Sequence, residues 1–476
     1  MKGLAKVVVA VLAATVLYGC CAVCCEEVEE DAAVDDQLGW RLSMQAYTFH
    51  SGTFFEAVDK THALGLKYIE MFPGQRISED DSATTNFGMS AATRLKVKEK
   101  LRDAGLKLVN YGVVGAGDEA GWRSLFEFAK DMGIETIVSE PRAEHMDLVE
   151  KLCDEFEINV AIHNHPRPTH YWNPDTVLKA VEGRSERMGA CADTGHWMRS
   201  GLDPIECLKK LEGRIISLHF KDLNESGGEG HDVPWGTGAG NAYSMLAEIK
   251  RQGLKGVFSI EYEYNWDNSV PEIRECARYF GLIAAAFAEE GYEPLFKEDL
   301  SEAIMSEGGW AVDGGVLAAK DEGDIWTKKR YGDFVIDLEF KCDPETNSGV
   351  FLRCKSIDEW LHTAIEVQIL QPAVERPTEC CGAIFDCLAP TKQMVKKPGE
   401  WNHYIIIAKA NRIYVILNGE QVIDMDLDLW TEPHKNPDDT PNKFNYAYKD
   451  MSREGHVGLQ YHGHPVWFRN LRIKPL

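Results

Sequence analysis

Positive charge is scarce in this sequence of 476 residues. Its 51 lysine and arginine residues face 76 aspartate and glutamate residues, which gives a formal net charge of −25. Binding to nucleic acid requires a basic surface, so the composition argues against that class of function. Seven of the acids lie between Glu26 and Asp36, which indicates a solvated tether. The remaining balance is typical of a soluble enzyme that acts on neutral small molecules.

The apolar run near the N-terminus is short, which favours a cleaved signal over a permanent membrane span. The apolar stretch Val7 to Leu17 follows Lys2 and Lys6, and it is shorter than the ~20 residues that a spanning helix needs. Leu17-Tyr18-Gly19-Cys20 comes next and resembles a bacterial lipoprotein processing site. We expect a signal peptide of the lipoprotein type at 1–20, an acidic linker at 21–39, and export to the bacterial cell envelope. The membrane would then be contacted only through a lipid on Cys20; a plain signal peptide or an uncleaved anchor is the alternative.

Cysteines with metal-site spacing are missing from the middle of the chain, where Cys153, Cys191, Cys207 and Cys276 are scattered. An exported protein can form disulfides, but their pairing cannot be deduced from a sequence. We expect most of these cysteines to be small buried apolar residues.

A glycine-rich phosphate loop is absent after the first predicted strand, where Gln45–Ser51 stands instead. This absence disfavours an open doubly wound sheet. Glycines at 65, 105 and 133 each end a predicted helix just before a strand. Short β-rich runs alternate with helical patterns, which favours a parallel (β/α)8 TIM barrel at 40–290. The eight predicted strands are Leu42–Tyr47, Lys67–Met71, Lys107–Val113, Glu135–Ser139, Asn159–His163, Met188–Asp193, Ile215–Phe220 and Gly256–Glu261.

The last third of the chain has a different pattern. After a predicted linker at 291–308, apolar and polar residues alternate in short runs, as in 334–340, 404–409 and 412–417, with a turn signal at Asn418-Gly419. This alternation predicts an antiparallel β-sandwich at 309–476.

Polar residues close the later barrel strands. Because carboxyl ends of parallel barrel strands meet at one rim, carboxylates and imidazoles there usually carry chemistry. Such oxygen and nitrogen donors suit a divalent ion, with Mn²⁺ as the first choice and Zn²⁺, Mg²⁺ or Co²⁺ as alternatives. We predict Asp193, His219 and Glu261 as ligands, with Glu140 or His163 as the fourth. The predicted bases are His165, Lys221 and His163, and His196 is a predicted substrate contact.

At these positions the barrel resembles the xylose isomerase-like family of sugar-phosphate isomerases and epimerases. The resemblance is carried by AspThrGlyHis (193–196), HisPheLysAsp (219–222) and SerIleGluTyr (259–262). It implies metal binding by Asp193, His219 and Glu261. The family's usual fourth ligand is a glutamate at the end of the fifth strand, where this sequence has His163.

The last domain resembles the 3-keto-disaccharide hydrolase domain, a concanavalin-like sandwich. The runs that carry the resemblance are 324–334, AsnSerGlyValPheLeuArg (347–353), IleGluValGlnIleLeu (365–370) and GlyGluTrpAsnHisTyr (399–404). Independently, Glu366 and Gln368 share one face of an otherwise apolar strand. We predict Glu366 and Arg353 as catalytic residues and Asn347 and Gln368 as substrate contacts. The predicted residues for stacking on a sugar ring are Trp326, Trp401 and Trp467.

Together the two resemblances imply an exported enzyme that cleaves 3-keto-glycosides by elimination and hydration, with a small-molecule sugar or glycoside as substrate. One domain would eliminate and the other hydrate. The alternatives are a sugar isomerase or epimerase joined to a non-catalytic carbohydrate-binding sandwich, a metal-dependent endonuclease, and a surface sugar-binding protein without catalysis. Charge and export argue against the endonuclease, and nothing in the sequence indicates an oligomeric state.

Overall fold

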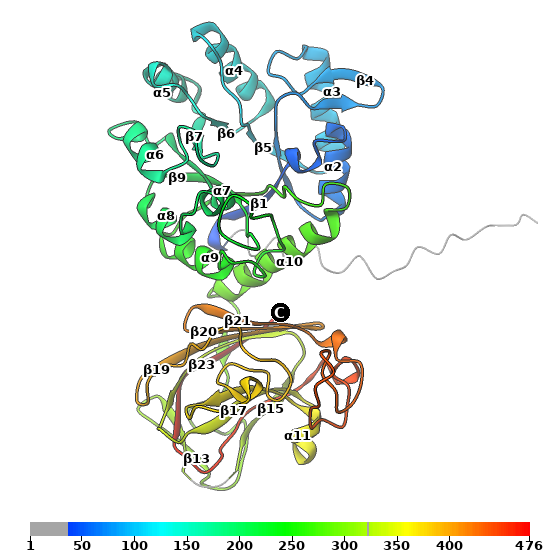
Figure 1. Ribbon diagram of the computed structural model, residues 1–476, viewed down its shortest axis with the longest axis vertical. Helices are drawn as coiled ribbons and strands as arrows, with labels where there is room; N and C mark the ends of the chain where they lie inside the picture. The colour runs from blue at the N-terminus through cyan, green and yellow to red at the C-terminus, as the bar shows by residue number, and fades with distance from the viewer. Residues whose placement is uncertain (1–36, 321–322) are drawn as a thin grey trace, which may run out of the picture.

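The computed structural model describes residues 37–320 and 323–476. The predicted signal peptide, Cys20 and most of the predicted acidic linker lie outside these residues. Within them, no helix combines the length and the apolar character needed to cross a bilayer. Two domains follow one another along the chain, a barrel and a sandwich (Figure 1).

The first domain is a closed parallel barrel in the order β1-β10-β9-β8-β7-β6-β5-β2. All eight predicted strands are present, with ends that differ from the prediction by no more than a few residues. Their bounds are β1 Trp40–Gln45, β2 Tyr68–Met71, β5 Lys107–Tyr111, β6 Thr136–Ser139, β7 Asn159–His163, β8 Met188–Asp193, β9 Ile215–Phe220 and β10 Gly256–Ile260.

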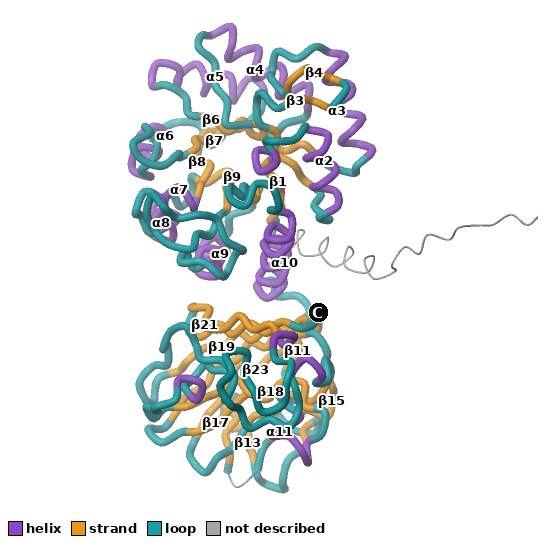
Figure 2. The backbone as a smooth tube through the Cα atoms, turned by 45° about the vertical axis from the view of Figure 1, so that its right-hand side comes forward, coloured by secondary structure: helices purple, strands orange, loops and turns teal. Residues whose placement is uncertain are grey.

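Helices follow the strands and form the outer ring of the barrel (Figure 2). They are α2 Phe54–Ala63, α3 Ala91–Asp103, α4 Glu119–Met132, α5 Met146–Phe156, α6 Pro174–Val181, α7 Thr194–Arg199, α8 Pro204–Lys210, α9 Ala242–Arg251 and α10 Val270–Phe287. Thr53 starts α2 with a capping box that it shares with Glu56. The predicted left-handed glycines are confirmed, with φ of 78° at Gly65, 68° at Gly105 and 75° at Gly133. A small hairpin, β3 Arg76–Ser78 and β4 Asp81–Thr84, was not predicted.

The second domain is the predicted antiparallel sandwich. One sheet has the order β13-β14-β23-β16-β19-β20-β21, with β11 paired to β23, and the other has the order β12-β15-β22-β17-β18. The strands are β11 Glu293–Pro294, β12 Ala303–Ile304, β13 Trp310–Asp313, β14 Val316–Ala319, β15 Ile325–Tyr331, β16 Phe334–Cys342, β17 Asn347–Cys354, β18 Ile365–Leu370, β19 Trp401–Lys409, β20 Arg412–Leu417, β21 Glu420–Asp426, β22 Gly455–Leu459 and β23 Val466–Pro475. A short helix, α11 Trp360–Thr363, precedes β18.

The segment 291–308, predicted as a linker, differs from that expectation. It contributes β11 and β12, which pair with β23 and β15 and so belong to the sandwich. Strands of only two residues are too short to show a periodic pattern, so the sequence did not predict them.

The two domains share an apolar interface. Val335, Ile405, Ile407, Tyr414 and Ile416 of the larger sheet belong to the same buried cluster as the barrel core. This sheet lies next to α10, on the side of the sandwich that faces the barrel (Figures 1 and 2). The inner core of the sandwich is a separate cluster. The smaller sheet therefore turns its outer face away from the barrel.

The cysteines of the described residues agree with the prediction that most are buried and apolar. Nine are free, and all of these except Cys380 are buried. No disulfide is formed among the residues that the structure describes.

Packing around β8 gives a test of the barrel. Gly189 lies so close to its neighbours that an added Cβ would stand 2.2 Å from the carbonyl oxygen of Arg214. Gly189→Ala is expected to destabilise the protein by about 1–3 kcal/mol, because a close-packed strand cannot yield to the extra methyl. Urea denaturation measures the change. Gly88→Ala is the control, since nothing lies within 4 Å of its Cβ position; equal stability of the two variants would contradict this packing.

Candidate active site

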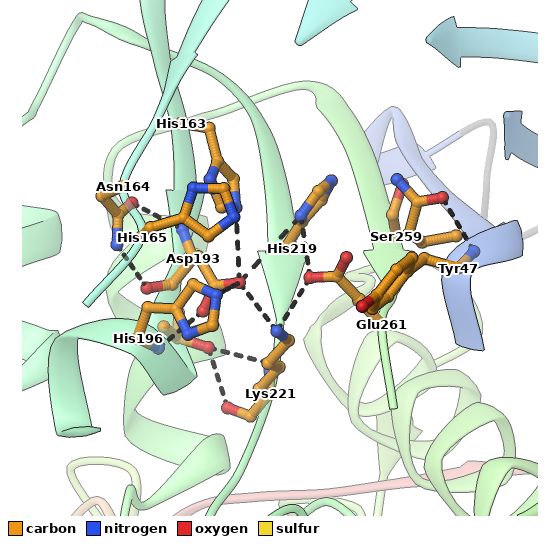
Figure 3. A network of polar contacts seen from close by, with 12 residues as sticks. Tyr47, His163, Asn164, His165, Asp193, His196, His219, Lys221, Ser259 and Glu261 are labelled. Carbon is orange, nitrogen blue, oxygen red and sulfur yellow. Dashed lines mark hydrogen bonds and ion pairs between the residues drawn. The ribbon is translucent and has the colours of Figure 1, made fainter. Parts of the chain in front are cut away.

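The predicted residues meet at the carboxyl ends of four neighbouring strands. His163 ends β7, Asp193 ends β8, His219 lies near the end of β9, and Glu261 directly follows β10. Parallel pairing of β8 with β9 places Asp193 beside His219. Their side chains point toward one another in Figure 3, and all four residues are buried.

Asp193 is the centre of this cluster. Its Oδ2 atom lies 3.6 Å from Nε2 of His163, 3.7 Å from Nε2 of His196 and 4.0 Å from Nδ1 of His219. These separations are too long for hydrogen bonds. They are close to the roughly 3–3.5 Å that separates two donors bound at about 2.1 Å to one ion. Donor atoms of His163, Asp193, His196 and Glu261 all lie within 4.8 Å of one another, so the cluster could hold a metal ion.

A second layer of carboxylates orients the imidazoles. Nε2 of His219 lies 2.9 Å from Oε1 of the buried Glu70, which leaves Nδ1 facing the cluster, 3.1 Å from Oε2 of Glu261. Three further donors hold the Glu70 carboxylate: Gln45, Asn110 and Ser259. A carboxylate on the far nitrogen of a histidine is the usual support for a metal ligand. The signal for Glu70 in the sequence was weak, because a single glutamate ends β2 without a neighbouring motif.

Nε2 of His163 is buried and has no hydrogen-bond partner among the described residues. Oδ2 of Asp193 and Nδ1 of His219 also lack a hydrogen bond there, but each faces a charged neighbour: Nζ of Lys221 lies 2.9 Å from Oδ2, and Oε2 of Glu261 lies 3.1 Å from Nδ1. Because buried polar atoms are nearly always satisfied, the free nitrogen of His163 is the atom that a cation in the cluster would satisfy.

The electrostatics of the cluster also indicate missing positive charge. Burial disfavours a charged His163, but Asp193 and Glu140 outweigh burial and raise its pKa to about 9. For His219 burial again opposes the charge, yet Cys191, Glu70 and Glu261 raise the pKa well above its ordinary value. The carboxylates thus draw protons onto two buried imidazoles, and a divalent ion would replace these protons.

Lys221, one of the predicted bases, is paired with carboxylates. Its ammonium group is buried and lies 2.9 Å from Asp193, 2.8 Å from Glu261 and 2.7 Å from Glu263. Burial opposes its charge, but these carboxylates prevail and hold the pKa well above the ordinary value. Lys221 therefore keeps its proton. The prediction of Lys221 as a base did not take these three carboxylates into account.

Glu140 lies outside the ligand cluster. It accepts a hydrogen bond from Nδ1 of His165 and is 3.4 Å from Nδ1 of His163. Of the two predicted fourth ligands, His163 lies beside Asp193, whereas Glu140 forms a second group with His163 and His165 whose donor atoms also lie within 4.8 Å of one another. Glu140 leaves Nε2 of His165 free at the mouth, where the ring is about half exposed.

His196, the predicted substrate contact, reaches the same cluster from α7. Its backbone N–H donates to Oδ1 of Asp193 at 2.6 Å, and its ring lies 5.4 Å from that of His165. Burial lowers its pKa well below the ordinary value, so the ring is neutral. A neutral imidazole beside the mouth can accept or donate a hydrogen bond to a hydroxyl group.

An aromatic wall at the mouth was not predicted. Tyr47 and Trp266 are 37% and 38% exposed, unusually high values for such large rings. His50 stacks on Tyr47 and contacts Trp266 edge-on at 4.5 Å. Tyr47 stands next to Glu261 in Figure 3. We name Tyr47, His50 and Trp266 the aromatic wall. Its residues come from loops after β1 and β10, and no local motif joins them.

The sandwich brings together Glu366, Gln368 and Asn347, as predicted. Glu366 and Gln368 alternate with core residues of β18, so they lie on the outer face of the smaller sheet. Gly349 on β17 makes room for the Glu366 carboxyl group, whose Oε1 lies 2.3 Å from where a Cβ would stand. Gln368 lies 3.1 Å from Glu366 and 3.3 Å from Asn347. Burial raises the pKa of Glu366 to about 8.

Arg353 does not belong to this group. Its guanidinium group donates to the carbonyl oxygens of Gly332 and Ala410 and pairs with Asp333 at 2.9 Å. Arg353 is buried near the end of β17 and connects the turns at Gly332 and Ala410. The prediction of Arg353 as a catalytic residue was therefore wrong. Strand parity alone did not reveal that the chain turns here, with φ of 51° at this residue.

The three tryptophans predicted to stack on a sugar lie on two different sheets. Trp401 and Trp467 lie on β19 and β23 of the larger sheet, where Lys341 covers both rings, so they cannot stack on a sugar at Glu366. Trp326 lies on the smaller sheet but is buried against Phe351 at 4.9 Å. Sequence reasoning could not assign these strands to sheets.

Comparisons with known proteins agree with both domains. A model of the xylose isomerase-like TIM barrel family matches residues 58–280, and a model of the 3-keto-alpha-glucoside-1,2-lyase-like domain matches residues 291–474. A curated relative from Bacteroides thetaiotaomicron, named 3-keto-disaccharide hydrolase, is 26% identical over 198 residues. That match covers 36% of this chain and 66% of the relative's length.

Two solved structures from Parabacteroides distasonis are also similar. One, provisionally described as a glycosyl hydrolase, is 37% identical, with 39% of this chain and 99% of that chain covered and a TM-score of 0.38. The other, an uncharacterised protein, is 34% identical, with 51% and 98% covered and a TM-score of 0.44.

The class of protein is therefore an enzyme that acts on sugars, built from a barrel and a sandwich. Residues 58–280 match the model of the xylose isomerase-like TIM barrel family, and residues 291–474 match the model of the 3-keto-alpha-glucoside-1,2-lyase-like domain.

Removal of one central carboxylate tests the cluster. Asp193→Ala and Glu261→Ala are expected to abolish binding of Mn²⁺, and Glu70→Gln to weaken it by about 10–100-fold, because Glu70 orients His219. Isothermal titration measures the affinities. Glu135→Gln, which alters a surface ion pair of the same domain, is the control; unchanged affinity in the Asp193 and Glu261 variants would place the ion elsewhere.

The buried carboxyl group of the sandwich predicts a pH dependence of stability. Between the ordinary pKa of 4.5 and the folded-state value of about 8, the folded protein holds a proton that the unfolded chain has released. Stability therefore falls as pH rises through this window, by roughly 1.4 kcal/mol per pH unit at most. Glu366→Gln should flatten this fall in urea denaturation, whereas Glu375→Gln, at an exposed position, should not. Equal slopes in all three proteins would show that Glu366 ionises normally.

Proposed function

We propose that this chain is an exported enzyme that cleaves 3-keto-glycosides by elimination and hydration, with a divalent ion at the barrel mouth. The observation that supports the proposal most is the convergence of buried donor atoms around Asp193 next to a carboxylate-backed histidine. A ketone substrate needs both features, a positive charge for its oxygen and a base for its acidic proton.

The chemistry follows from the ketone at carbon 3 of the sugar. The ketone acidifies the proton on carbon 2, and removal of that proton leaves electrons that form a double bond between carbons 1 and 2. The bond from carbon 1 to the glycosidic oxygen breaks, and the leaving oxygen takes up a proton. Addition of water returns a hydroxyl group to carbon 1 and a proton to carbon 2, so the net reaction is hydrolysis.

His165 is placed to act as the base. Glu140 accepts the Nδ1 proton of His165 and thereby leaves the Nε2 lone pair at the mouth. This arrangement fixes the tautomer, as in other carboxylate–histidine pairs. The charge on Glu140 also stabilises the imidazolium that forms when a proton is accepted.

A divalent ion held by Asp193 and Glu261, with His163 and either His196 or His219 as imidazole ligands, would supply positive charge for a carbonyl oxygen. Lys221 adds a second, permanent positive charge from the chain itself. It also keeps Asp193 and Glu261 ionised, because burial would raise the pKa of both carboxyl groups and the charges of Lys221 and the nearby histidines lower them. His196 offers a neutral hydrogen-bonding group to a sugar hydroxyl.

The aromatic wall is suited to the ring of a sugar or of a leaving aglycone. Exposed aromatic rings bind the apolar faces of pyranoses, and Tyr47 reaches the edge of the ligand cluster. The wall thus offers a position for the second ring of a glycoside beside the group that reacts.

The sandwich offers a second polar site on the far side of the molecule. At neutral pH Glu366 retains its proton and can donate it to a leaving oxygen or to carbon 2. The smaller sheet faces away from the barrel, so elimination and hydration at separate sites require the intermediate to leave one domain and reach the other. Export through the predicted lipoprotein signal would place both steps in the bacterial cell envelope.

A sugar isomerase or epimerase with a non-catalytic sandwich is the second candidate. It is favoured by the presence of Gln368 and Asn347 beside Glu366, since amides and a carboxyl group on a sheet face also suit passive sugar binding. Interconversion of free ketoses without glycosidic cleavage would select this alternative.

Product release decides between these functions. Purified protein with Mn²⁺ is expected to release the aglycone from a 3-keto-glucoside and to leave the unoxidised glucoside intact, as measured by chromatography. Turnover of the unoxidised glucoside, or no release from any 3-keto-glycoside, would overturn the proposal.

Replacement of the base separates chemistry from binding. His165→Ala should lower kcat for aglycone release by about 10²–10⁴-fold, with a small change in KM, because general bases contribute rate factors of this size. His170→Ala, at a ring nearby in the same loop, is the control. A loss confined to KM would assign His165 to binding.

A further inference from the structure

The loop between β9 and α9 touches both the barrel site and the sandwich. It starts with Lys221, whose ammonium group lies among the carboxylates of the cluster, and it ends at Asn241, which caps α9. The loop is long and rich in glycine. Such a segment has little fixed structure of its own, so its path depends on the groups that hold it.

Asp222 holds the loop from inside the barrel. Its buried carboxylate accepts the backbone N–H groups of Gly236, Gly238 and Gly240, each at 3.0 Å. An added Cβ at Gly238 would lie 2.3 Å from Oδ1 of Asp222, so this close approach requires glycine. The three bonds fix the second half of the loop directly beside Lys221.

The first half of the loop is tied to the same site. Asp232 accepts from Arg199 at 2.7 Å, and Arg199 also pairs with Glu263. Glu263 in turn accepts from Lys221 at 2.7 Å. The loop is therefore linked through Arg199 and Glu263 to the ammonium group of Lys221 and helps to fix its position.

The sandwich holds the loop from outside. At the hairpin between β20 and β21, Nε2 of Gln421 donates to the carbonyl oxygen of Gly236 at 2.8 Å, and Oε1 of Gln421 accepts from Tyr279 at 2.8 Å. At the end of the loop, Asn241 donates to Glu420 at 2.8 Å. Close by, Ser244 donates to the carbonyl oxygen of Gly419 at 2.7 Å.

We propose that Gln421 of the sandwich is a positioning residue for the barrel site: the β20–β21 hairpin fixes the β9–α9 loop, and the loop fixes Lys221, Arg199 and Glu263. Gln421 is well suited to this task, because one amide bridges the loop backbone and α10. The barrel site is then complete only when the sandwich is docked, which gives a physical reason for joining these two domains in one chain. The inference rests on the proposed function in taking the barrel mouth as the catalytic site.

Hydrogen exchange of the full chain tests the proposal directly. Gln421→Ala should accelerate exchange of the amides of Gly236, Gly238 and Gly240 by about five-fold, the equilibrium factor of one typical hydrogen bond. Gln421→Glu should do the same, because it retains the acceptor for Tyr279 and loses the donor to Gly236. Arg412→Ala is the matched control. It removes another link between the domains, the pair with Glu275 of α10, without touching the loop.

The outcomes differ for a positioning residue and for a simple docking contact. Faster exchange of the loop in both Gln421 variants, with an unchanged loop in Arg412→Ala, supports the proposal. An unchanged loop in the Gln421 variants, or equal acceleration in Arg412→Ala, overturns it. Thermal unfolding of each variant verifies that the chain is folded. If Gln421→Ala does not fold, the exchange rates of Gln421→Glu alone decide whether the proposal holds.

Turnover adds a readout that general loosening would not produce. On a 3-keto-glucoside, Gln421→Ala should lower kcat by about ten-fold or more with KM nearly unchanged, since misplacement of charged groups acts on the transition state. If the wild-type chain neither binds Mn²⁺ nor cleaves this substrate, the proposed function fails, while the exchange of the loop amides still decides the role of Gln421.

Discussion

The barrel site depends on two carboxylates, Asp193 and Glu261, that are buried in a small volume. Burying like charges is costly unless positive charge is brought to them. The chain supplies part of it through Lys221 and draws protons onto His163 and His219 for the rest. The outer carboxylates Glu70 and Glu140 then determine which imidazole nitrogen faces the centre. The raised pKa values of His163 and His219 follow from this concentration of buried negative charge.

Much of this arrangement could be predicted from the sequence. The later apolar runs of the barrel end in polar residues, and parallel strands carry their ends to one rim, so the closeness of Asp193, His219 and Glu261 follows from spacing and topology. The eight strands were recognisable because short β-rich runs alternate with helical patterns, three of which end in a left-handed glycine. The longer strands of the sandwich were recognisable by their alternation of apolar and polar residues.

Other features depend on contacts between distant segments, which a sequence pattern does not encode. Glu70 lies 149 positions from the His219 that it orients. The role of Lys221 was misjudged because the carboxylate of Glu263 could not be placed beside it. Arg353 and the tryptophans of the sandwich were assigned to the site of Glu366, but Trp401 and Trp467 lie on the other sheet, Trp326 is buried, and Arg353 binds two turns. The contact of Gln421 with the barrel depends on how the two domains pack.

The central claim is that a cation is held at the centre of the cluster, and diffraction from crystals soaked in Mn²⁺ tests it most directly. An anomalous difference map collected at the manganese absorption edge should show one strong peak within about 2.0–2.3 Å of donor atoms from Asp193, Glu261, His163 and His219. A map without a peak between these residues, in crystals that bind manganese elsewhere or not at all, would contradict the account.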